Sequence, residues 1–156
     1  MYLNTNESVR QSGYALPNAT VVNKADSANE KMVAYFWHSV PGYSKMGSYH
    51  GNANNDGKFV YTGFKPAFVL LKRHTDSTNN WEIRVNKRVT KNPNNERLFP
   101  NTGDTKSVGE GVDFFNNGFK LRNSGTGSNS NDKLYIYMAF AEQPLTTQYG
   151  TQSNGE

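Results

Sequence analysis

The side chains that most often carry out catalysis are few in this chain and lie far apart. Its three histidines are His38, His50 and His74, and none belongs to a serine or cysteine nucleophile motif. Cysteine is absent, which removes thiol chemistry, disulfides and zinc–thiolate sites. The Asp and Glu residues form no recognisable acid–base pair, so glycoside hydrolysis is not indicated. The sequence therefore predicts a protein that is not an enzyme, with no catalytic residue and no cofactor.

One segment has the outline of a calcium-binding loop. Residues 52–57 read Asn-Ala-Asn-Asn-Asp-Gly, which follows the alternating oxygen ligands of such loops. The first ligand is Asn52 rather than an aspartate, and Gly63 stands where a bidentate glutamate is needed. One carboxylate, that of Asp56, is too little charge for a divalent ion. We therefore expect a hairpin turn here and no metal site.

A second segment, residues 124–128, reads Ser-Gly-Thr-Gly-Ser and has the composition of a phosphate-binding loop. It lacks the lysine and the following helix that a phosphate loop requires. The segment is predicted to be a flexible surface loop.

Aromatic and basic side chains supply the candidates for ligand binding. Tryptophans on a surface stack on sugar rings, and charged neighbours bond the hydroxyls. Between Lys58 and Arg97 the chain has nine Lys and Arg against three Asp and Glu. This stretch is either a docking face for an acidic partner or a solvated face that discourages edge-to-edge pairing of strands. The candidate binding residues are Trp37, His38, Trp81, Arg84, Lys87 and Arg88.

Short apolar or alternating runs between polar turns predict that strands position these side chains. The 21 Asn and 14 Gly favour tight turns and are unfavourable inside helices. Apolar residues at helical spacing are missing, so no helix longer than about two turns is expected. The predicted strands are residues 32–37, 58–62, 66–72, 81–86, 112–115, 119–122 and 134–140. They predict an all-β fold, an antiparallel β-sandwich of jelly-roll-like type.

Alternation along the strands predicts which side chains face the core. In residues 81–86 the apolar set is Trp81, Ile83 and Val85. The polar set, predicted to face solvent, is Glu82, Arg84 and Asn86. The predicted core also contains Phe68, Leu70, Phe140 and either Tyr135 or Ile136. The Asn-Gly pair at 117–118 predicts a hairpin between the strands on either side of it.

Part of the chain repeats at an offset of 102 residues, from position 29 to position 131. Residues 29–36 (Asn-Glu-Lys-Met-Val-Ala-Tyr-Phe) align with residues 131–138 (Asn-Asp-Lys-Leu-Tyr-Ile-Tyr-Met). Residues 1–40 are therefore interpreted as the back half of a preceding unit, residues 41–145 as a complete unit, and residues 146–156 as a polar tail. Residues 1–40 either complete the same domain or pair with a neighbouring subunit.

Tandem units of this size are typical of fibres and surface arrays, in which each unit packs against its neighbours. The two repeated apolar runs, 32–37 and 134–140, are the natural candidates for such packing. The candidate assembly residues are Met32, Val33, Tyr35, Tyr135 and Tyr137.

Four strings carry a family resemblance: residues 42–52 (Gly-Tyr-Ser-Lys-Met-Gly-Ser-Tyr-His-Gly-Asn), 56–73, 117–122 and 135–142. They resemble a domain of unknown function found in tail and fibre-like virion proteins of marine bacteriophages. The resemblance covers residues 41–145 continuously, and residues 1–40 resemble the closing half of the same domain. Where that domain ends in Phe-Ala-Glu, the first copy here has Trp37, His38 and Ser39 instead.

The resemblance implies a non-enzymatic structural protein of a bacteriophage virion. It would act in a tail fibre, or as an accessory protein on the capsid or particle surface, in assembly and in host-surface attachment. The alternative is a carbohydrate-binding, lectin-like module that recognises host surface glycans. The two differ in exposure, because sugar binding needs an open aromatic platform and assembly needs apolar edges that a partner covers.

The implied partners are other virion proteins and further copies of this chain in a homo-oligomer, with a host surface glycan in the alternative. The implied location is the virion, assembled in the host cytoplasm. No run approaches the roughly 18 apolar residues of a membrane span, so no membrane partner is expected. Nucleic acid ranks last, since the positive excess is confined to one stretch.

Overall fold

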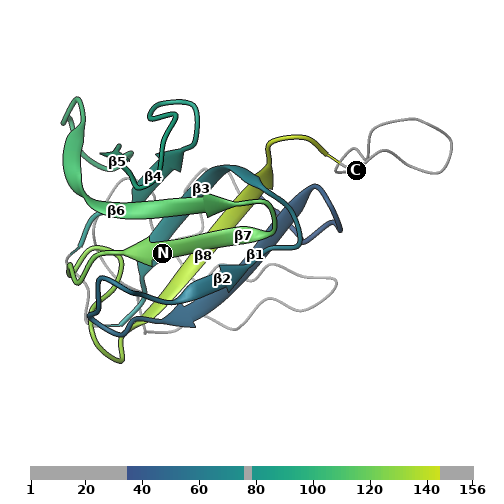
Figure 1. Cartoon of the computed structure of the whole chain (residues 1–156). Helices are drawn as coiled ribbons and strands as arrows, with labels where there is room; N and C mark the ends of the chain where they lie inside the picture. Colours follow the sequence, from purple (N-terminus) through teal and green to yellow (C-terminus); the bar gives the residue numbers. More distant parts are fainter. Residues whose placement is uncertain (1–34, 76–78, 145–156) are drawn as a thin grey trace, which may run out of the picture.

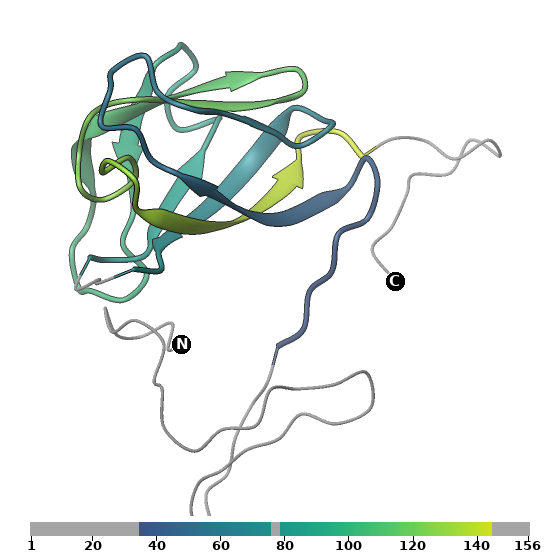
Figure 2. The same ribbon diagram turned by 90° about the horizontal axis from the view of Figure 1, so that it is seen from below.

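The structure, a computed structural model, describes residues 35–75 and 79–144, which form eight strands and no helix (Figure 1). Two four-stranded antiparallel sheets lie face to face (Figure 2). Sheet A has the order β1 (Ser44–His50), β8 (Leu134–Ala141), β3 (Pro66–Arg73), β4 (Glu82–Val85). Sheet B has the order β2 (Phe59–Tyr61), β7 (Gly118–Arg122), β6 (Ser107–Phe115), β5 (Asn94–Arg97). The predicted all-β sandwich is confirmed.

Strands from the two ends of the described chain pair with each other: β1 pairs with β8, and β2 pairs with β7. This nesting of the chain ends is what a jelly-roll produces. Strand β8 also pairs with β3, which is distant in sequence. The other pairs, β3–β4, β5–β6 and β6–β7, join strands that are consecutive in sequence. The predicted hairpin is among them, with Phe115 of β6 opposite Gly118 of β7.

The core fills the space between the two sheets with alternate side chains of the central strands. In β8 the inward residues include Tyr135 and Tyr137, while Phe140 lies on the other face. Within sheet A, Tyr49 stacks on Tyr135 at 5.2 Å. Between the sheets, Phe119 of sheet B lies edge-on to Tyr137 at 5.6 Å and to Tyr49 at 6.4 Å. The core members are Tyr49, Val60, Phe64, Val69, Leu71, Val112, Phe114, Phe119, Leu121, Tyr135, Tyr137 and Ala139.

The core prediction was correct for Tyr135 and for Leu70, which are both buried. Leu70 stands opposite Met138 on the outer face of sheet A, so it is buried outside the cluster between the sheets. Phe68 and Phe140 pair with each other on the same outer face and are only half-buried. Both faces of β3 and β8 are apolar, so alternation could not identify the inner face.

Strand β4 has the opposite orientation to the predicted one. Glu82 and Arg84 are buried, with 2% and 0% of their surface exposed, and Ile83 is half-buried on the outer face. The register explains this, because Leu71 stands opposite Glu82 and Val69 opposite Arg84. Directly opposed residues share a face, so the inward side chains of β3 bring these charges inward.

The two long sides of the sandwich differ. On one side Ile83 and Leu98 exchange backbone hydrogen bonds of 2.9 and 3.1 Å, which links β4 in sheet A to the chain after β5 in sheet B. On the other side lie β1 and β2, whose outer edges pair with no strand of the described chain. The sandwich is thus closed along β4 and β5 and open along β1 and β2.

The predicted strand at residues 32–37 is wrong for its described part. Tyr35, Phe36 and Trp37 are exposed and belong to no strand. Met32 and Val33 lie outside the described residues, as do residues 1–34 generally and the tail from 145 onward. Figure 2 shows the described segment before β1 leaving the sandwich at the corner where β1 begins.

The segment predicted to be a hairpin turn at residues 52–57 connects β1 in sheet A to β2 in sheet B, so the hairpin was wrong. Two side chains shape it: the Asn52 Oδ1 atom accepts a hydrogen bond from the Asn54 amide, and the Asn54 Oδ1 atom accepts one from the Asp56 amide. These Asx turns account for the alternating polar residues that resembled a metal loop.

Candidate functional site

Four of the predicted site residues are buried. Trp81 is 7% exposed and Arg84 is fully buried, so neither presents a binding face. Tyr135 and Tyr137 are core residues and therefore offer no assembly surface. Arg84 and Tyr137 were assigned to a surface by residue type, whereas the pairing of β3 with β4 and β8 turns them inward. For Trp81 and Tyr135, strand alternation had also predicted burial, and burial is what the structure has.

Arg84 belongs to a buried ion cluster near the closed side. Its Nη2 atom lies 2.8 Å from Glu82 Oε2, and Glu82 Oε1 lies 3.0 Å from Arg97 Nη1. Arg97 Nη1 also lies 3.0 Å from Glu110 Oε1. Burial raises the pKa of Glu82, and the positive charges of Arg84 and Arg97 oppose that rise. Two positive and two negative charges balance, so the cluster is a structural core for this side of the sandwich.

The predicted surface loop at residues 124–128 covers this cluster. Ser128 is fully buried and donates from its hydroxyl to Glu110 Oε2 at 3.1 Å. Two inward tyrosines hold the loop, with the Tyr49 hydroxyl donating to Ser128 O and the Tyr135 hydroxyl donating to Thr126 O. The loop is at the surface only in part, because Ser124 and Thr126 are exposed whereas Gly127 and Ser128 are buried. Gly127 allows a close approach to the cluster, since a Cβ there would lie 2.1 Å from Glu82 Oε1.

Lys87 and Arg88 are the exposed members of the predicted basic face, and both are paired. Lys87 contacts the carboxylate of Glu142, and Arg88 Nη2 lies 3.3 Å from Glu96 Oε2. With Arg84 inside, the structure does not bring the three cations into one positive surface.

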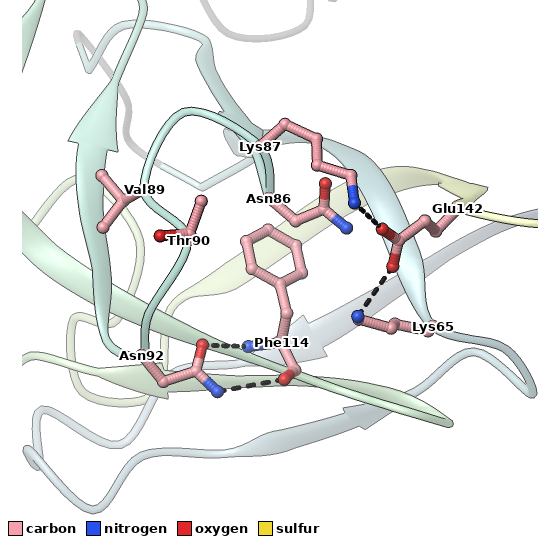
Figure 3. A pocket seen from close by; sticks show the side chains of 8 residues that line it. All are labelled: Lys65, Asn86, Lys87, Val89, Thr90, Asn92, Phe114 and Glu142. Carbon is pink, nitrogen blue, oxygen red and sulfur yellow. Dashed lines mark hydrogen bonds and ion pairs between the residues drawn. The ribbon is translucent and has the colours of Figure 1, made fainter.

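A small pocket opens beside Lys87 (Figure 3). Its volume is about 220 Å³, below the roughly 300–1,000 Å³ of most small-molecule sites. Hydrogen bonds from Lys65 and Lys87 lower the pKa of Glu142 to about 2. On the opposite wall Asn92 accepts from the Phe114 amide at 3.0 Å and donates to its carbonyl at 3.1 Å. The pocket is lined by Lys65, Asn86, Lys87, Val89, Thr90, Asn92, Phe114 and Glu142.

The open side offers a different kind of site, the outer edge of β1. Val40 and Ser44 exchange backbone hydrogen bonds of 3.0 and 2.9 Å, so residues 41–43 form a tight turn. The chain before it also contacts β1 through side chains: the Ser44 hydroxyl donates to His38 O at 2.9 Å, and the Met46 amide donates to Ser39 Oγ at 3.0 Å. Backbone groups of an antiparallel strand alternate in direction, so those of Ser48 point outward like the Met46 amide. No strand of the described chain uses them.

The aromatic residues before this turn are exposed. Tyr35 and Trp37 are 68% and 48% exposed, and their rings stack at 5.8 Å with planes inclined by 23°. His38 is exposed beside them, and its Nδ1 atom lies 3.3 Å from Ser39 O. Of the predicted residues, these three are the ones that the structure brings together on a surface.

Sequence reasoning did not identify β1 as an edge strand. Residues 44–50 contain few β-branched or apolar residues, and all seven pair with residues of β8, far along the chain. The available signal was the Pro-Gly pair at 41–42, which marks a turn immediately before it.

Two further observations concern the described ranges only. They contain no helix long and apolar enough to cross a bilayer. They also contain no group of three or more His, Asp or Glu side chains arranged to hold a metal ion.

Comparisons with known proteins return one family. Neither the curated proteins nor the solved structures contain a match to the chain. The matching family model is described as a domain of unknown function, DUF7483, and it matches residues 3–144. Because the match spans nearly the whole sequence, the chain belongs to the DUF7483 family.

Proposed function

We propose that this chain is a non-enzymatic structural module of a bacteriophage virion, placed in a tail fibre or on the particle surface. The observation that carries the assembly role is the open edge of β1 beside the exposed residues Tyr35, Phe36 and Trp37. An edge strand with free backbone groups accepts another strand, and proteins that do not use such an edge normally protect it. The virion context itself comes from the sequence resemblance to phage fibre-like proteins.

In this proposal the run 32–37 of one copy adds to β1 of a neighbouring copy. Its described residues extend away from their own sandwich, which leaves their own β1 uncovered. Repetition of the contact joins copies head to tail, and such contacts form rings or filaments. The partners are further copies of this chain and other virion proteins.

Proline at position 48 tests the contact. Ser48→Pro removes one outward N–H from β1 and no hydrogen bond to β8, so edge-strand proline leaves the sandwich intact. Ser48→Thr is the matched control, because it keeps the N–H and favours strand geometry. We expect wild type and Ser48→Thr to form oligomers in light scattering and Ser48→Pro to be a folded monomer.

The protein composition of purified phage particles tests the proposed location in the virion. We expect the wild-type protein in purified virions by mass spectrometry, and Ser48→Pro at reduced copy number. Wild type that is monomeric at all concentrations, or absent from particles, contradicts the corresponding half of the proposal.

Carbohydrate binding is the second candidate, and the stacked, exposed Tyr35 and Trp37 favour it. An aromatic pair open to solvent beside His38 is suited to stack on a sugar ring. Saturable glycan binding by a variant that no longer assembles supports this candidate over assembly alone.

A further inference from the structure

Three aromatic side chains form an exposed cluster on the outer face of sheet B, the sheet nearest the viewer in Figure 1. Phe59 and Tyr61 of β2 are 44% and 64% exposed, and Phe115 of β6 is 38% exposed. The rings of Phe59 and Phe115 meet edge to face at 5.9 Å. Their strands are separated by β7, where Gly118 stands opposite both Tyr61 and Phe115.

Gly118 lies in β7 beneath the rings and has no side chain to separate them from the strand. A Cβ at this position would lie 2.7 Å from Phe59 Cζ, so the Phe59 ring lies directly on the strand. We call Phe59, Tyr61, Phe115 and Gly118 the aromatic platform. Val60, which lies between Phe59 and Tyr61 in β2, is buried in the core. Because side chains alternate along a strand, Phe59 and Tyr61 point to solvent.

Charged side chains border the platform along β7. Lys120 stands opposite Phe59 on one side and Asp113 on the other. Its Nζ atom lies 2.7 Å from Asp56 Oδ1, and Arg122 Nη1 lies 2.8 Å from the same oxygen. Arg122 Nε also bonds Asp113 Oδ2 at 2.5 Å. Two cations and two anions form one row of paired charges.

The equal number of positive and negative side chains in this row favours one class of ligand over others. A polyanion, including nucleic acid, needs an excess of unpaired cations, and this row has none to spare. An apolar surface of a partner protein would remove water from these four charged side chains, and that desolvation is costly. A neutral saccharide fits both halves of the surface, because its C–H faces pack on aromatic rings and its hydroxyls accept from cations and donate to carboxylates.

We propose that the aromatic platform and its charged row bind a neutral saccharide chain across β2, β7 and β6. The inference rests on the carbohydrate-binding candidate and places the site on sheet B, away from Trp37. Tyr61 and Phe115 supply the stacking faces, and Lys120, Arg122 and Asp56 supply hydrogen bonds to hydroxyls.

The test uses the full-length chain on an array of neutral hexose oligosaccharides with sulfated and uronic-acid glycans as comparison, followed by calorimetric titration of the best neutral glycan. We expect Tyr61→Ala and Phe115→Ala each to weaken binding at least about tenfold. Val108→Ala is the matched control, since Val108 is 61% exposed on β6 outside the platform, and it should bind like wild type. Thermal unfolding verifies that each variant is folded.

The outcomes distinguish the aromatic platform as the binding site from carbohydrate binding by the chain in general. Neutral glycan binding that added salt leaves nearly unchanged supports the site, because a ligand without charge has no net electrostatic attraction for salt to screen. Binding lost in Trp37→Ala but kept in Tyr61→Ala overturns the platform and keeps the carbohydrate-binding candidate. Binding to no neutral glycan, or to anionic glycans alone with strong salt dependence, overturns both.

Discussion

Glu82 holds two arginines from within the protein interior. It contacts Arg84 and Arg97, and only Arg97 has a second carboxylate, that of Glu110. Arg84 therefore depends on Glu82 for its ion pair among the described residues, and its Nε atom has no hydrogen-bond partner there. Removing one partner of a buried ion pair destabilises a protein more than replacing both partners by apolar residues, because the remaining charge stays buried without a partner.

We predict that Glu82→Ala lowers the free energy of unfolding by about 3–5 kcal/mol, the usual cost of a buried charge left alone. Glu110→Ala is the control and should cost less, because Glu110 is partly exposed and Arg97 keeps Glu82. Urea unfolding measures both. A loss of under ~1 kcal/mol for Glu82→Ala would show that Arg84 reaches water once its partner is removed.

Glu142 predicts how stability depends on pH. Its pKa in the folded chain is about 2, against an ordinary value of 4.5. Between these values the unfolded chain binds the proton and the folded chain does not, so its contribution is present above about pH 4.5 and is lost as the pH falls towards about 2. Because its lysine partners are solvent-exposed, we expect well under ~1 kcal/mol from this group.

Glu142→Gln should therefore flatten the fall in the urea midpoint over that acid range and leave the neutral range almost unchanged. Added salt should reduce the difference between wild type and variant, since exposed pairs are screened. A variant whose acid dependence equals that of wild type would assign the pH response to other carboxylates, such as Asp56 or Glu96, whose pKa values are also lowered.

At the scale of strands, local pattern identified the strands whose own residues favour them. β2, β3, β7 and β8 are aromatic or β-branched and begin or end within two residues of the predicted bounds. β5, with the sequence Asn-Asn-Glu-Arg, has no such preference. It forms because β6 pairs with it and because the buried Asn94 donates to Val85 O at 2.9 Å. That information lies in other segments and could not be read locally.

The same limit explains β4 and the candidate site. Alternation gave the correct period for residues 82–85 but not the face that points inward. That face is set by the register with β3 and by the ion pair of Glu82 with Arg97, both of which lie outside the segment. The exposed aromatic pair at Tyr35 and Trp37 included a residue predicted to bind, whereas the aromatic platform was missed. Phe59 and Phe115 had been assigned to strands, and only the pairing of β2, β7 and β6 shows that their rings point outward.

The β6–β7 hairpin shows a glycine needed for a reason other than turn conformation. The Asn-Gly pair was predicted to form the turn, and Gly118 is instead the first residue of β7. A Cβ there would lie 2.3 Å from the Val60 carbonyl oxygen, which is backbone and cannot move aside alone. We predict that Gly118→Ala costs about 1–3 kcal/mol through overpacking.

Gly103→Ala is the matched control, because no atom lies within 4 Å of a Cβ at that position. It should change stability by no more than ~0.5 kcal/mol. Equal effects of the two substitutions in thermal or urea unfolding would mean that β2 shifts to accommodate the methyl group. Glycan binding by Gly118→Ala should also fall, since Phe59 would be displaced from the strand.

Across the whole molecule, stability and proposed function are placed on opposite long sides. The closed side has the Ile83–Leu98 bridge and the ion cluster, which tie sheet A to sheet B. The open side has the free edge of β1, and β2 with two rings of the aromatic platform. A sandwich fastened along one side leaves the strands of the other side available for partners. The proposed strand contact uses β1 there, and the proposed saccharide site begins at β2 and extends over the outer face of sheet B to β6.

This arrangement predicts the effect of removing the chain before the turn. A protein that begins at His38 keeps Ser39, the Val40–Ser44 bridge and every described strand, but loses the run 32–37. If that run is donated to a neighbour, the shortened protein is a cooperatively folded monomer that still binds neutral glycan through sheet B. If it instead completes its own sandwich, the shortened protein aggregates or unfolds at lower urea. Sedimentation velocity, urea unfolding and glycan titration on the same sample separate the two, and a folded monomer with unchanged glycan affinity is the result that we expect.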